Sequence, residues 1–371
     1  MTAQGLEHFY SVIPAGGVGS RLWPLSRADA PKFLHDLTGS GHTLLRDTWD
    51  RLVPLSGADR IMVVTGRAHR AAVEAQLPEL IDRNVVLESE PRDSSAAIGL
   101  AAAILVKREP DVIIGSFAAD HVIGKLDRFN AAVTEAVAVA EAGFIALIGI
   151  TPSEPATGFG YIHFGERHTI DRAPRARMVD RFVEKPDLET AQSYVADGSY
   201  LWNASMFISR ADVLLAQLGQ AEPELLAGLT ELADAWDGPE RGAVVDKVWP
   251  TLRKIAIDYS VAEPAAAAGR VVVIPADFEW DDVGDFASIA KLHAGGRKSD
   301  LAILGEDARV LADSSTGIVI SQGKRLISLI GVTDIVVVDT EDALLVTTTA
   351  NAQRVKSVVD ALKLSGRSDV L

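Results

Sequence analysis

Residues 13–34 read Ile13-Pro-Ala-Gly-Gly-Val-Gly-Ser-Arg-Leu-Trp-Pro-Leu-Ser-Arg-Ala-Asp-Ala-Pro-Lys-Phe-Leu34. This glycine-rich loop directly follows an apolar run. Its glycines at positions 16, 17 and 19 lack Cβ atoms, so backbone N–H groups can converge on an anion. Arg21 offers a planar fork that suits phosphate oxygens, and Lys32 adds a point charge on a flexible stem. The stretch predicts a nucleoside triphosphate cradle, with a plain strand-to-helix turn as the structural alternative.

Two common phosphate-binding motifs do not fit this loop. Lys32 follows no Gly-x-x-x-x-Gly pattern, and Gly17-Val-Gly19 lacks the later glycine of a dinucleotide fingerprint. The loop region is basic, because positions 21 to 32 carry three cations and a single acid, Asp29, in a chain of net charge −15. Nucleic-acid binding depends on a basic face, so this charge distribution favours a small anionic ligand over a nucleic acid.

Length and composition limit the class of protein. The 371 residues exceed the roughly 250 to 300 that one hydrophobic core supports, so we expect two domains, residues 1–295 and 300–371, joined by a linker at 295–300. No apolar run approaches the ~20 residues that a membrane span needs, and the N-terminal residues do not resemble a signal peptide. We therefore expect a cytoplasmic protein without membrane contact. The absence of cysteine excludes disulfides, thiolate metal sites and cysteine nucleophiles.

Apolar runs that alternate with helical patterns predict an α/β fold with a parallel sheet. The expected strands are 10–14, 61–65, 85–87, 112–117 and 144–150, and the expected helices are 44–55, 68–77, 95–107 and 128–141. The alanine-rich helix 95–107 should lie against the sheet. Ligands of such sheets bind beyond the carboxyl ends of the strands, where the glycine loop and Ala118-Ala-Asp-His121 both occur.

The second half has a different pattern. Near-alternating runs at 160–164, 176–183 and 200–208 predict sheet extensions that close over the ligand, and acidic, alanine-rich helices are expected within 211–248. After Asp300 the pattern becomes short β runs separated by Gly and Asp turns, at 301–304, 308–311, 317–321, 326–331, 335–339 and 343–347.

The glycine loop resembles the signature of the sugar nucleotidyltransferases, and its continuation Leu22-Trp-Pro-Leu-Ser-Arg27 resembles the mannose-1-phosphate guanylyltransferase branch. The resemblance covers nearly the whole chain. It implies a Rossmann-like nucleotidyltransferase (GT-A-like) domain with a mixed, mainly parallel sheet, a small left-handed β-helix-like C-terminal domain, and a homodimer. Longer relatives carry a fused cupin isomerase domain, for which we expect no room here.

The resemblance also implies which residues bind the nucleotide. These are Ala15, Gly16, Gly17, Gly19, Ser20, Arg21, Glu88, Pro91, Asp93, Ala119 and Asp120. The base-binding segment Glu88–Ala97 departs from the family pattern, because Ser94-Ser-Ala96 stands where Thr-Ala-Pro is common. A loop with a helix N-cap at Ser94 or Ser95 is the structural alternative. This departure keeps a nucleotide with another base as an alternative substrate.

Two carboxylates match the family's magnesium ligands. Asp120 follows a buried strand, where an unpaired charge is costly, and Asp282 lies in Glu279-Trp-Asp-Asp-Val-Gly-Asp285. Magnesium takes one or two protein carboxylates together with phosphate oxygens and waters. The structural alternatives are a helix cap for Asp120 and a solvated acidic loop for residues 281–285. We assign no proton transfer to His121, which the resemblance makes a loop organiser.

The sugar phosphate site rests on the same resemblance. Lys185 in Phe182-Val-Glu-Lys-Pro186 would meet the 1-phosphate and Glu184 a sugar hydroxyl, although the pair could equally form an exposed ion pair. Asn203 would contact the sugar, and Ser205 replaces the usual glycine of that motif. The remaining implied sugar-site residues are Gly160, Tyr161 and Asp258, and a buried structural carboxylate is an equal alternative for Asp258.

The implied reaction is magnesium-assisted transfer of GMP from GTP to α-D-mannose 1-phosphate, giving GDP-mannose and pyrophosphate. Arg21, Lys32 and Lys185 would be its catalytic cations. The alternatives are a nucleotidyltransferase for another hexose or heptose 1-phosphate or another base, and a non-catalytic nucleotide-sugar regulatory subunit. Because no residue assigned to chemistry lies beyond Asp282, we expect the C-terminal β segment to act on stability and assembly, and on catalysis only indirectly.

Overall fold

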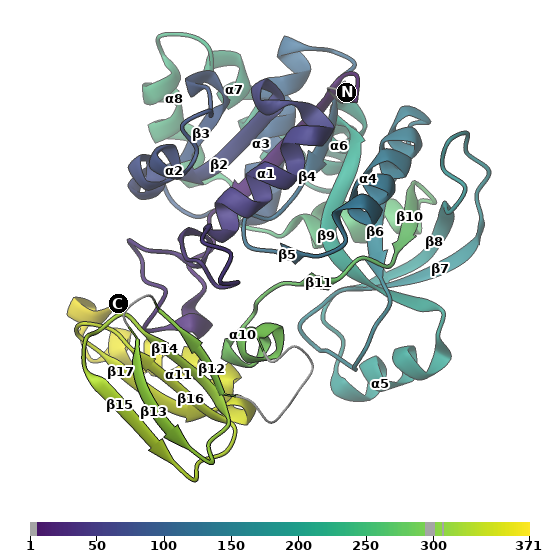
Figure 1. The fold of residues 1–371 in the computed structure, drawn as a ribbon. Helices are drawn as coiled ribbons and strands as arrows, with labels where there is room; N and C mark the ends of the chain where they lie inside the picture. Colours follow the sequence, from purple (N-terminus) through teal and green to yellow (C-terminus); the bar gives the residue numbers. More distant parts are fainter. Residues whose placement is uncertain (1–5, 294–300, 306–307) are drawn as a thin grey trace. The chain divides into compact units, whose positions relative to one another are not determined.

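The computed structural model describes residues 6–293, 301–305 and 308–371. Its contacts divide the chain into two compact units that are discontinuous in sequence (Figure 1). The first unit comprises the chain up to Gly16, Thr48–Ala119 and Ile123–Trp280, and the second comprises Gly17–Asp47, Asp120–Val122 and Asp281–Leu371. The expected linker at 295–300 lies outside the described residues, so the boundary between 1–295 and 300–371 stays a prediction.

The first unit is built on a nine-stranded mixed sheet with the order β3-β2-β1-β4-β9-β6-β10-β8-β7. Strands β8 and β9 run against the other seven, so the sheet is mainly parallel, as predicted. The strands are β1 (Phe9–Ala15), β2 (Ile61–Gly66), β3 (Val85–Glu88), β4 (Ile113–Ser116), β6 (Ile145–Ile150), β7 (Tyr161–Arg167), β8 (Arg177–Val183), β9 (Tyr200–Arg210) and β10 (Val271–Ala276). The five strands expected in the first half are all present.

Strand β9 corrects one expectation. It lies in the middle of the sheet, paired antiparallel with both β4 and β6, and is not a peripheral extension. Most of its residues are buried, including Asn203, because neighbours cover both faces and both edges. The sequence distance between β4 and β9 hides this placement, since only the tertiary structure shows which strands pair.

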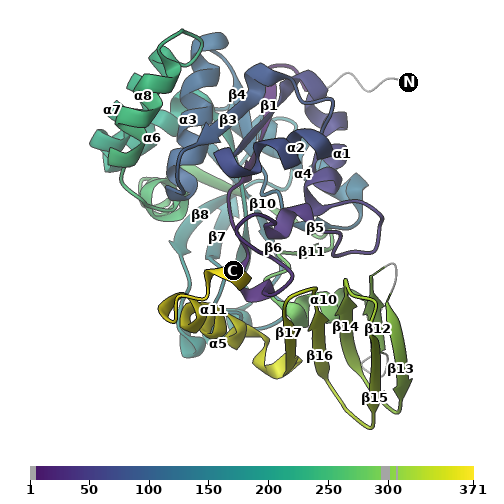
Figure 2. The same ribbon diagram turned by 90° about the vertical axis from the view of Figure 1, so that its left-hand side faces the viewer.

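Helices cover both faces of this sheet. They are α1 (Leu44–Ser56), α2 (Arg70–Gln76), α3 (Asp93–Arg108), α4 (Leu126–Glu141), α5 (Leu188–Asp197), α6 (Ala211–Ala221), α7 (Pro223–Ala235), α8 (Arg241–Val248) and α9 (Glu263–Ala267). Along β1, Phe9 and Val12 differ in parity and so point to opposite faces. Phe9 stacks edge-on against Phe117, which in turn stacks on Phe129 of α4, whereas Val12 belongs to the cluster formed with α3. Figure 2 shows α3, α6 and α7 on one side of the strands and α4 on the other.

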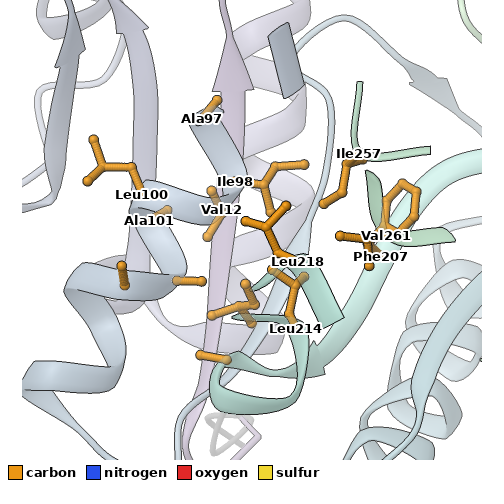
Figure 3. Close-up of a cluster of buried hydrophobic side chains, with 14 of the residues drawn as sticks. Val12, Ala97, Ile98, Leu100, Ala101, Phe207, Leu214, Leu218, Ile257 and Val261 are labelled. Carbon is orange, nitrogen blue, oxygen red and sulfur yellow. The ribbon is translucent and has the colours of Figure 1, made fainter. Parts of the chain in front are cut away.

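The alanine-rich helix α3 packs against the sheet as predicted. Eleven of its sixteen residues are buried, because small side chains let the helix approach β1 and β2 closely. Figure 3 shows Ile98 and Ala101 of α3 near Val12, with Leu214 and Leu218 of α6 in the same cluster. A Cβ at Gly99 would lie only 2.7 Å from a methyl group of Leu229 on α7, which measures how closely these helices approach.

The second unit contains the β-helix-like segment. Strands β12 (Leu301–Leu304), β14 (Gly317–Ser321) and β16 (Ile335–Asp339) pair in parallel, and β17 (Leu344–Thr348) closes this sheet antiparallel. A second sheet pairs β13 (Arg309–Asp313) with β15 (Leu326–Ile330) in parallel. The chain thus coils between two sheets, as predicted. Gly317 (φ +124°) is required in this coil, because a side chain there would collide with the Ile335 backbone.

The core of the second unit joins this segment to the glycine loop. Helices α10 (Phe286–His293) and α11 (Val355–Leu364) lie in it. A single hydrophobic cluster contains Leu22, Trp23, Leu25, Leu37, Leu44, Val283, Phe286, Ile289, Ile318, Ile320, Val336, Val338, Leu345, Ala352, Val355, Val359 and Val370. The C-terminal segment and the predicted phosphate loop therefore share one core.

The two-residue strands β5 (Val122–Ile123) and β11 (Trp280–Asp281) lie where the chain passes from one unit to the other. Within the described ranges, every helix is too short or too polar to cross a membrane.

Candidate active site

The predicted site residues fall into two groups, one in each unit. The first unit contains Ala15, Gly16, Glu88, Pro91, Asp93, Ala119, Gly160, Tyr161, Glu184, Lys185, Asn203 and Asp258. The second unit contains Gly17, Gly19, Ser20, Arg21, Lys32, Asp120 and Asp282.

In the second unit the glycine loop folds back onto Lys32. Gly19 has φ +76°, and a Cβ there would lie 2.7 Å from Cβ of Lys32, so both conformation and space require glycine. The backbone N–H of Lys32 donates to the Val18 carbonyl (3.1 Å), and the Ser26 hydroxyl donates to the Gly19 carbonyl (2.6 Å). Arg21 is exposed in the short 3-10 turn Ser20–Leu22, whereas Lys32 is buried.

Lys32 brings the two predicted metal carboxylate segments together. Its ammonium group lies 2.6 Å from Oδ2 of Asp120 and donates to the backbone carbonyls of Asp282 (2.6 Å) and Val283 (3.4 Å). A Cβ at Gly284 would lie 3.2 Å from Oδ2 of Asp282 and 3.3 Å from a guanidinium nitrogen of Arg21. Residues from three distant segments, carrying two cations and two carboxylates, thus meet within one unit.

The two carboxylates respond to this environment in opposite directions. Burial would raise the pKa of Asp120, but the charges of Lys32 and His121 and the hydrogen bond from Lys32 hold it below its usual value. Burial raises the pKa of Asp282 to about 6; Lys32 opposes this shift, whereas Asp281 and Asp120 add to it. The negative charges of these close carboxylates repel one another, and a bound cation would relieve that repulsion.

The structural alternatives for these carboxylates do not hold. The helix that follows Asp120 begins at Leu126, so Asp120 is no cap. Asp285 is buried and accepts hydrogen bonds from the backbone of Ala287 (2.7 Å) and Ser288 (3.1 Å), so the 281–285 loop is not simply solvated. Among the described residues, no three His, Cys, Asp or Glu side chains converge as a metal cage. The two aspartates with hard oxygen donors fit a cation that takes its other ligands from phosphates and water.

In the first unit, Glu88 ends strand β3 beside the start of the glycine loop. A Cβ at Gly16 would lie 3.2 Å from Oε2 of Glu88, so glycine admits this carboxylate. Burial, reinforced by the charge of Asp93, raises the pKa of Glu88 to about 7. Ala15 is buried at the end of β1, Ala119 is buried in the loop that follows β4, and Pro91 is exposed.

Ser94 and Ser95 do not cap helix α3, contrary to the structural alternative. The helix has no side-chain cap hydrogen bond. The Ser94 hydroxyl accepts from the Ile257 backbone N–H (2.9 Å), and the Ser95 hydroxyl hydrogen-bonds to that of Ser260 (2.7 Å). The two serines therefore fasten the start of α3 to the π-helical turn Asp258–Ala262.

The sugar-site candidates of the first unit form a connected polar cluster. Lys185 donates to Oε1 of Glu184 (2.7 Å), and the pair is asymmetric, since the Glu184 side chain is 6% exposed and that of Lys185 57%. A Cβ at Gly160 would lie 2.5 Å from Oε2 of Glu184, so glycine is needed beside this carboxylate. The pair is thus not simply an exposed surface ion pair, because the Glu184 carboxylate is buried and only the Lys185 side chain is exposed.

Asn203 and Asp258 join the same cluster. The Asn203 side chain donates to Oδ1 of Asp258 (2.8 Å), and its own carbonyl accepts from the Ser205 backbone (3.1 Å). Burial, together with the charge of Glu184, raises the pKa of Asp258 to about 7. Ser205 has φ +53°, a left-handed conformation that suits the glycine it replaces.

Tyr161 lies in this region with a different environment. Its side chain is fully buried, and its hydroxyl donates to the Ala156 carbonyl (2.9 Å). In this structure the phenol therefore stabilises the preceding loop.

The nucleotidyl transferase family model matches residues 10–299, and the model of the MannoseP isomerase/GMP-like beta-helix domain matches residues 307–362. The chain belongs to the mannose-1-phosphate guanylyltransferase branch of the nucleotidyl transferase family. Members of the nucleotidyl transferase family generally use a divalent metal, in agreement with the paired aspartates.

The relatives cover nearly the whole chain. A mannose-1-phosphate guanylyltransferase of Escherichia coli K12 is 37% identical over 97% of this chain and 74% of its own length. The xanthan biosynthesis protein XanB of Xanthomonas campestris is 36% identical over 96% of this chain and 74% of its own. A solved Thermus thermophilus structure, described as a mannose-1-phosphate geranyltransferase, superposes with a TM-score of 0.84 at 30% identity, covering 96% of this chain and 99% of that one.

One residue of the glycine loop received no role from the sequence. Arg27 is the third cation between positions 21 and 32, and its side chain is only 14% exposed. Both terminal nitrogens of its guanidinium contact the carboxylate of Asp342, at 3.1 and 2.6 Å. The excess of cations in the loop indicated that Arg27 needs an acidic partner. Asp342 could not be found from the sequence, because it lies 315 residues away and belongs to no motif.

Proposed function

We propose that the protein transfers GMP from GTP to α-D-mannose 1-phosphate, giving GDP-mannose and pyrophosphate. The main support for this proposal is the set of contacts that Lys32 makes next to the glycine loop. Lys32 forms an ion pair with Asp120 and donates to the backbone carbonyl of Asp282, in a chain that belongs to the guanylyltransferase branch of the family. The substrate assignment comes from relatives that are named mannose-1-phosphate guanylyltransferase.

The chemistry needs charge neutralisation more than proton transfer. A phosphate monoester has its second pKa near 6, so the attacking oxygen of the sugar 1-phosphate is already ionised at neutral pH. The barrier comes from bringing one anion to the α-phosphorus of another in line with the leaving pyrophosphate. In this proposal Arg21 and Lys32 stabilise the triphosphate, and Lys185 holds the sugar phosphate against repulsion.

We take the divalent metal to be magnesium, with Asp120 and Asp282 as its protein ligands. Two carboxylates are a sufficient protein share for this ion, whose remaining ligands are phosphate oxygens and waters. When bound, magnesium supplies charge neutralisation at the phosphate oxygens. Lys32 pairs with Asp120 here, and its charge opposes the effect of burial on the pKa of both aspartates, so it favours their ionised forms.

A close alternative is transfer to another hexose or heptose 1-phosphate, or from another nucleotide. Ser205 adds a side chain beside Asn203 where the family pattern has glycine, and the Ser94–Ala96 segment departs from the base-binding pattern. A regulatory subunit without catalysis is less well supported, because Asp120, Lys185 and Asp282 are all present. The homodimer and the cytoplasmic location stay predictions.

A substrate matrix tests the proposal. Purified full-length protein with magnesium would be incubated with GTP, ATP, UTP, CTP or dTTP against mannose 1-phosphate or glucose 1-phosphate, and pyrophosphate release would be measured. We expect the highest kcat/KM with GTP and mannose 1-phosphate, by at least about 10-fold, the scale of one well-placed discriminating contact. A higher value for another pair would select the alternative, and no release with any pair would support a regulatory subunit.

The division of cations between the substrates has its own test. Lys185→Ala should raise the KM for mannose 1-phosphate far more than the KM for GTP, whereas Arg21→Ala should impair GTP binding and turnover. Equal effects of both variants on the two Michaelis constants would show that the assignment is wrong.

A further inference from the structure

The turn that follows the phosphate loop rests on the C-terminal segment. Leu22, Trp23 and Leu25 are 1%, 8% and 5% exposed. Their hydrophobic cluster also contains Ile318, Val336, Val338, Val355, Val359 and Val370. Leu37 and Leu44 belong to the same cluster, but most of its other members lie between Val283 and Val370, so the position of the turn depends on residues far along the chain.

Polar contacts fix this turn to the same segment. The indole N–H of Trp23 donates to the backbone carbonyl of Val370 (2.7 Å). Arg27 forms its two-point ion pair with Asp342 and also donates to the Thr340 hydroxyl (3.3 Å). A two-point guanidinium–carboxylate contact fixes orientation as well as distance.

The turn leads directly to the predicted phosphate contacts. Ser26, next to Arg27, donates to the Gly19 carbonyl (2.6 Å), and Gly19 packs on Cβ of Lys32. Arg21 lies two residues before Trp23. A displacement of the turn would therefore move Arg21 and loosen the packing around Lys32.

The loop of the second carboxylate is held by the same part of the chain. Asp285, three residues after Asp282, accepts a hydrogen bond from the side-chain amide of Gln353. Val283, between them, is fully buried in the shared cluster. The C-terminal segment thus contacts both the cation-bearing loop and the loop that carries Asp282.

We propose that two contacts position the triphosphate-binding loop. They are the ion pair between Arg27 and Asp342 and the hydrogen bond from Trp23 to the backbone carbonyl of Val370. The C-terminal segment is then part of the catalytic apparatus, and not only a unit for stability and assembly as the sequence led us to expect. This inference rests on the proposed function, because it assigns the loop to the nucleoside triphosphate.

The test compares two variants that remove similar ion pairs. Asp342→Ala takes the two-point partner from Arg27 (14% exposed), and the control Asp237→Ala does the same to Arg108 (19% exposed), which belongs to the first unit. Trp23→Phe removes the indole donor while it keeps an aromatic ring in the core. Circular dichroism and thermal unfolding would establish that each variant is folded.

We expect Asp342→Ala and Trp23→Phe to lower kcat/KM for GTP by about 10-fold or more, as a misplaced binding group does, while the KM for mannose 1-phosphate stays within about twofold. Asp237→Ala should leave both parameters near wild type, and Asp342→Glu should recover most of the loss, because it restores a carboxylate. A purely structural role would lower the melting temperature of Asp342→Ala and Asp237→Ala without this split.

Folded Asp342→Ala and Trp23→Phe proteins with wild-type kinetics for GTP would overturn the inference. Equal losses for both substrates would do the same. Failure of the proposed function is a separate result, because it appears in the substrate matrix of the wild-type protein. The difference between the effects on the nucleotide and on the sugar phosphate would then be measured with the two substrates that the wild type accepts. If Asp342→Ala does not fold, Asp342→Asn and Trp23→Phe carry the test.

Discussion

Lys32 shows how a single side chain can organise distant residues. Its ammonium group satisfies Asp120 and two backbone carbonyls of the Asp282 loop, and its stem packs on Gly19. Lys32 is buried, and a buried ammonium is costly unless it is paired; the carboxylate of Asp120, whose side chain is 30% exposed, supplies the partner. The two groups therefore stabilise each other and hold the predicted metal ligands in place.

The two aspartates should be essential for turnover. Asp120→Asn and Asp282→Asn should each lower kcat/KM at saturating magnesium by at least about 100-fold, the typical effect of deleting one preorganised electrostatic group. Asp29→Asn, at an exposed position of the same glycine loop, provides the control and should remain near wild type. Steady-state pyrophosphate release measures all three, and wild-type rates in either of the first two would refute the metal assignment.

Glu88 should make stability depend on pH. The folded protein retains the Glu88 proton up to a pKa of about 7, whereas the unfolded chain releases it near 4.5. Between these values the folded state binds more protons, so a rise in pH lowers the free energy of unfolding, by up to about 3 kcal/mol above pH 7.

Glu88→Gln should abolish that contribution. We expect the variant to gain stability over wild type as the pH rises from 5 to 8, with a difference below about 1 kcal/mol at pH 5. Denaturant unfolding at several pH values measures it, with Glu224→Gln at an exposed position as the control. A difference that is constant over this pH range would contradict the prediction.

At the scale of elements, helix α3 is the centre of the first unit's main core. It packs on β1 and β2 and on helices α6 and α7, with Leu218 of α6 buried next to its glycine. The π-helical turn Asp258–Ala262 is fastened to the start of α3 through Ser95 and Ser260, so α3 also links the base-segment candidates to Asp258.

Leu218→Ala should therefore destabilise the first unit. A buried leucine reduced to alanine costs about 2–5 kcal/mol, because apolar contacts are lost and a cavity remains. Leu364→Ala on α11, where the leucine is 91% exposed, should change stability by less than about 0.5 kcal/mol. Chemical denaturation of both variants checks this, and similar losses in the two would show that the α3–α6 contact is not a main source of stability.

At the scale of the whole molecule, the compact units do not follow the order of the chain. The second unit combines the glycine loop, three residues around Asp120 and the C-terminal β segment, because their apolar side chains share one core. A chain cut in the expected linker would keep the loop and lose the residues that cover it.

Truncation after Ser299 should give an aggregated protein without measurable nucleotidyl transfer. Leu22, Trp23, Leu25, Val283 and Phe286 would lose the members of their cluster that lie between Ile318 and Val370, and large exposed apolar patches promote association. Size-exclusion chromatography and pyrophosphate release measure the outcome. A monodisperse truncated protein with substantial activity would show that the loop holds its geometry without the C-terminal segment.

The sequence by itself determined the fold class, the family and nearly all the elements. Apolar periodicity is a local property, so the first-half strands, helix α3 and the short C-terminal strands could be predicted within a few residues. The glycine loop and the aspartate motifs identified the candidate site, because phosphate and metal chemistry requires particular residue types at short spacing.

Only the tertiary structure decided which distant segments meet. The central position of β9, the buried partners of Ser94 and Ser95, the contact of Lys32 with both aspartate segments and the Arg27–Asp342 pair all join residues far apart in the chain. No local pattern encodes such contacts, since they arise when separate apolar faces are buried together and the polar groups between them must find partners.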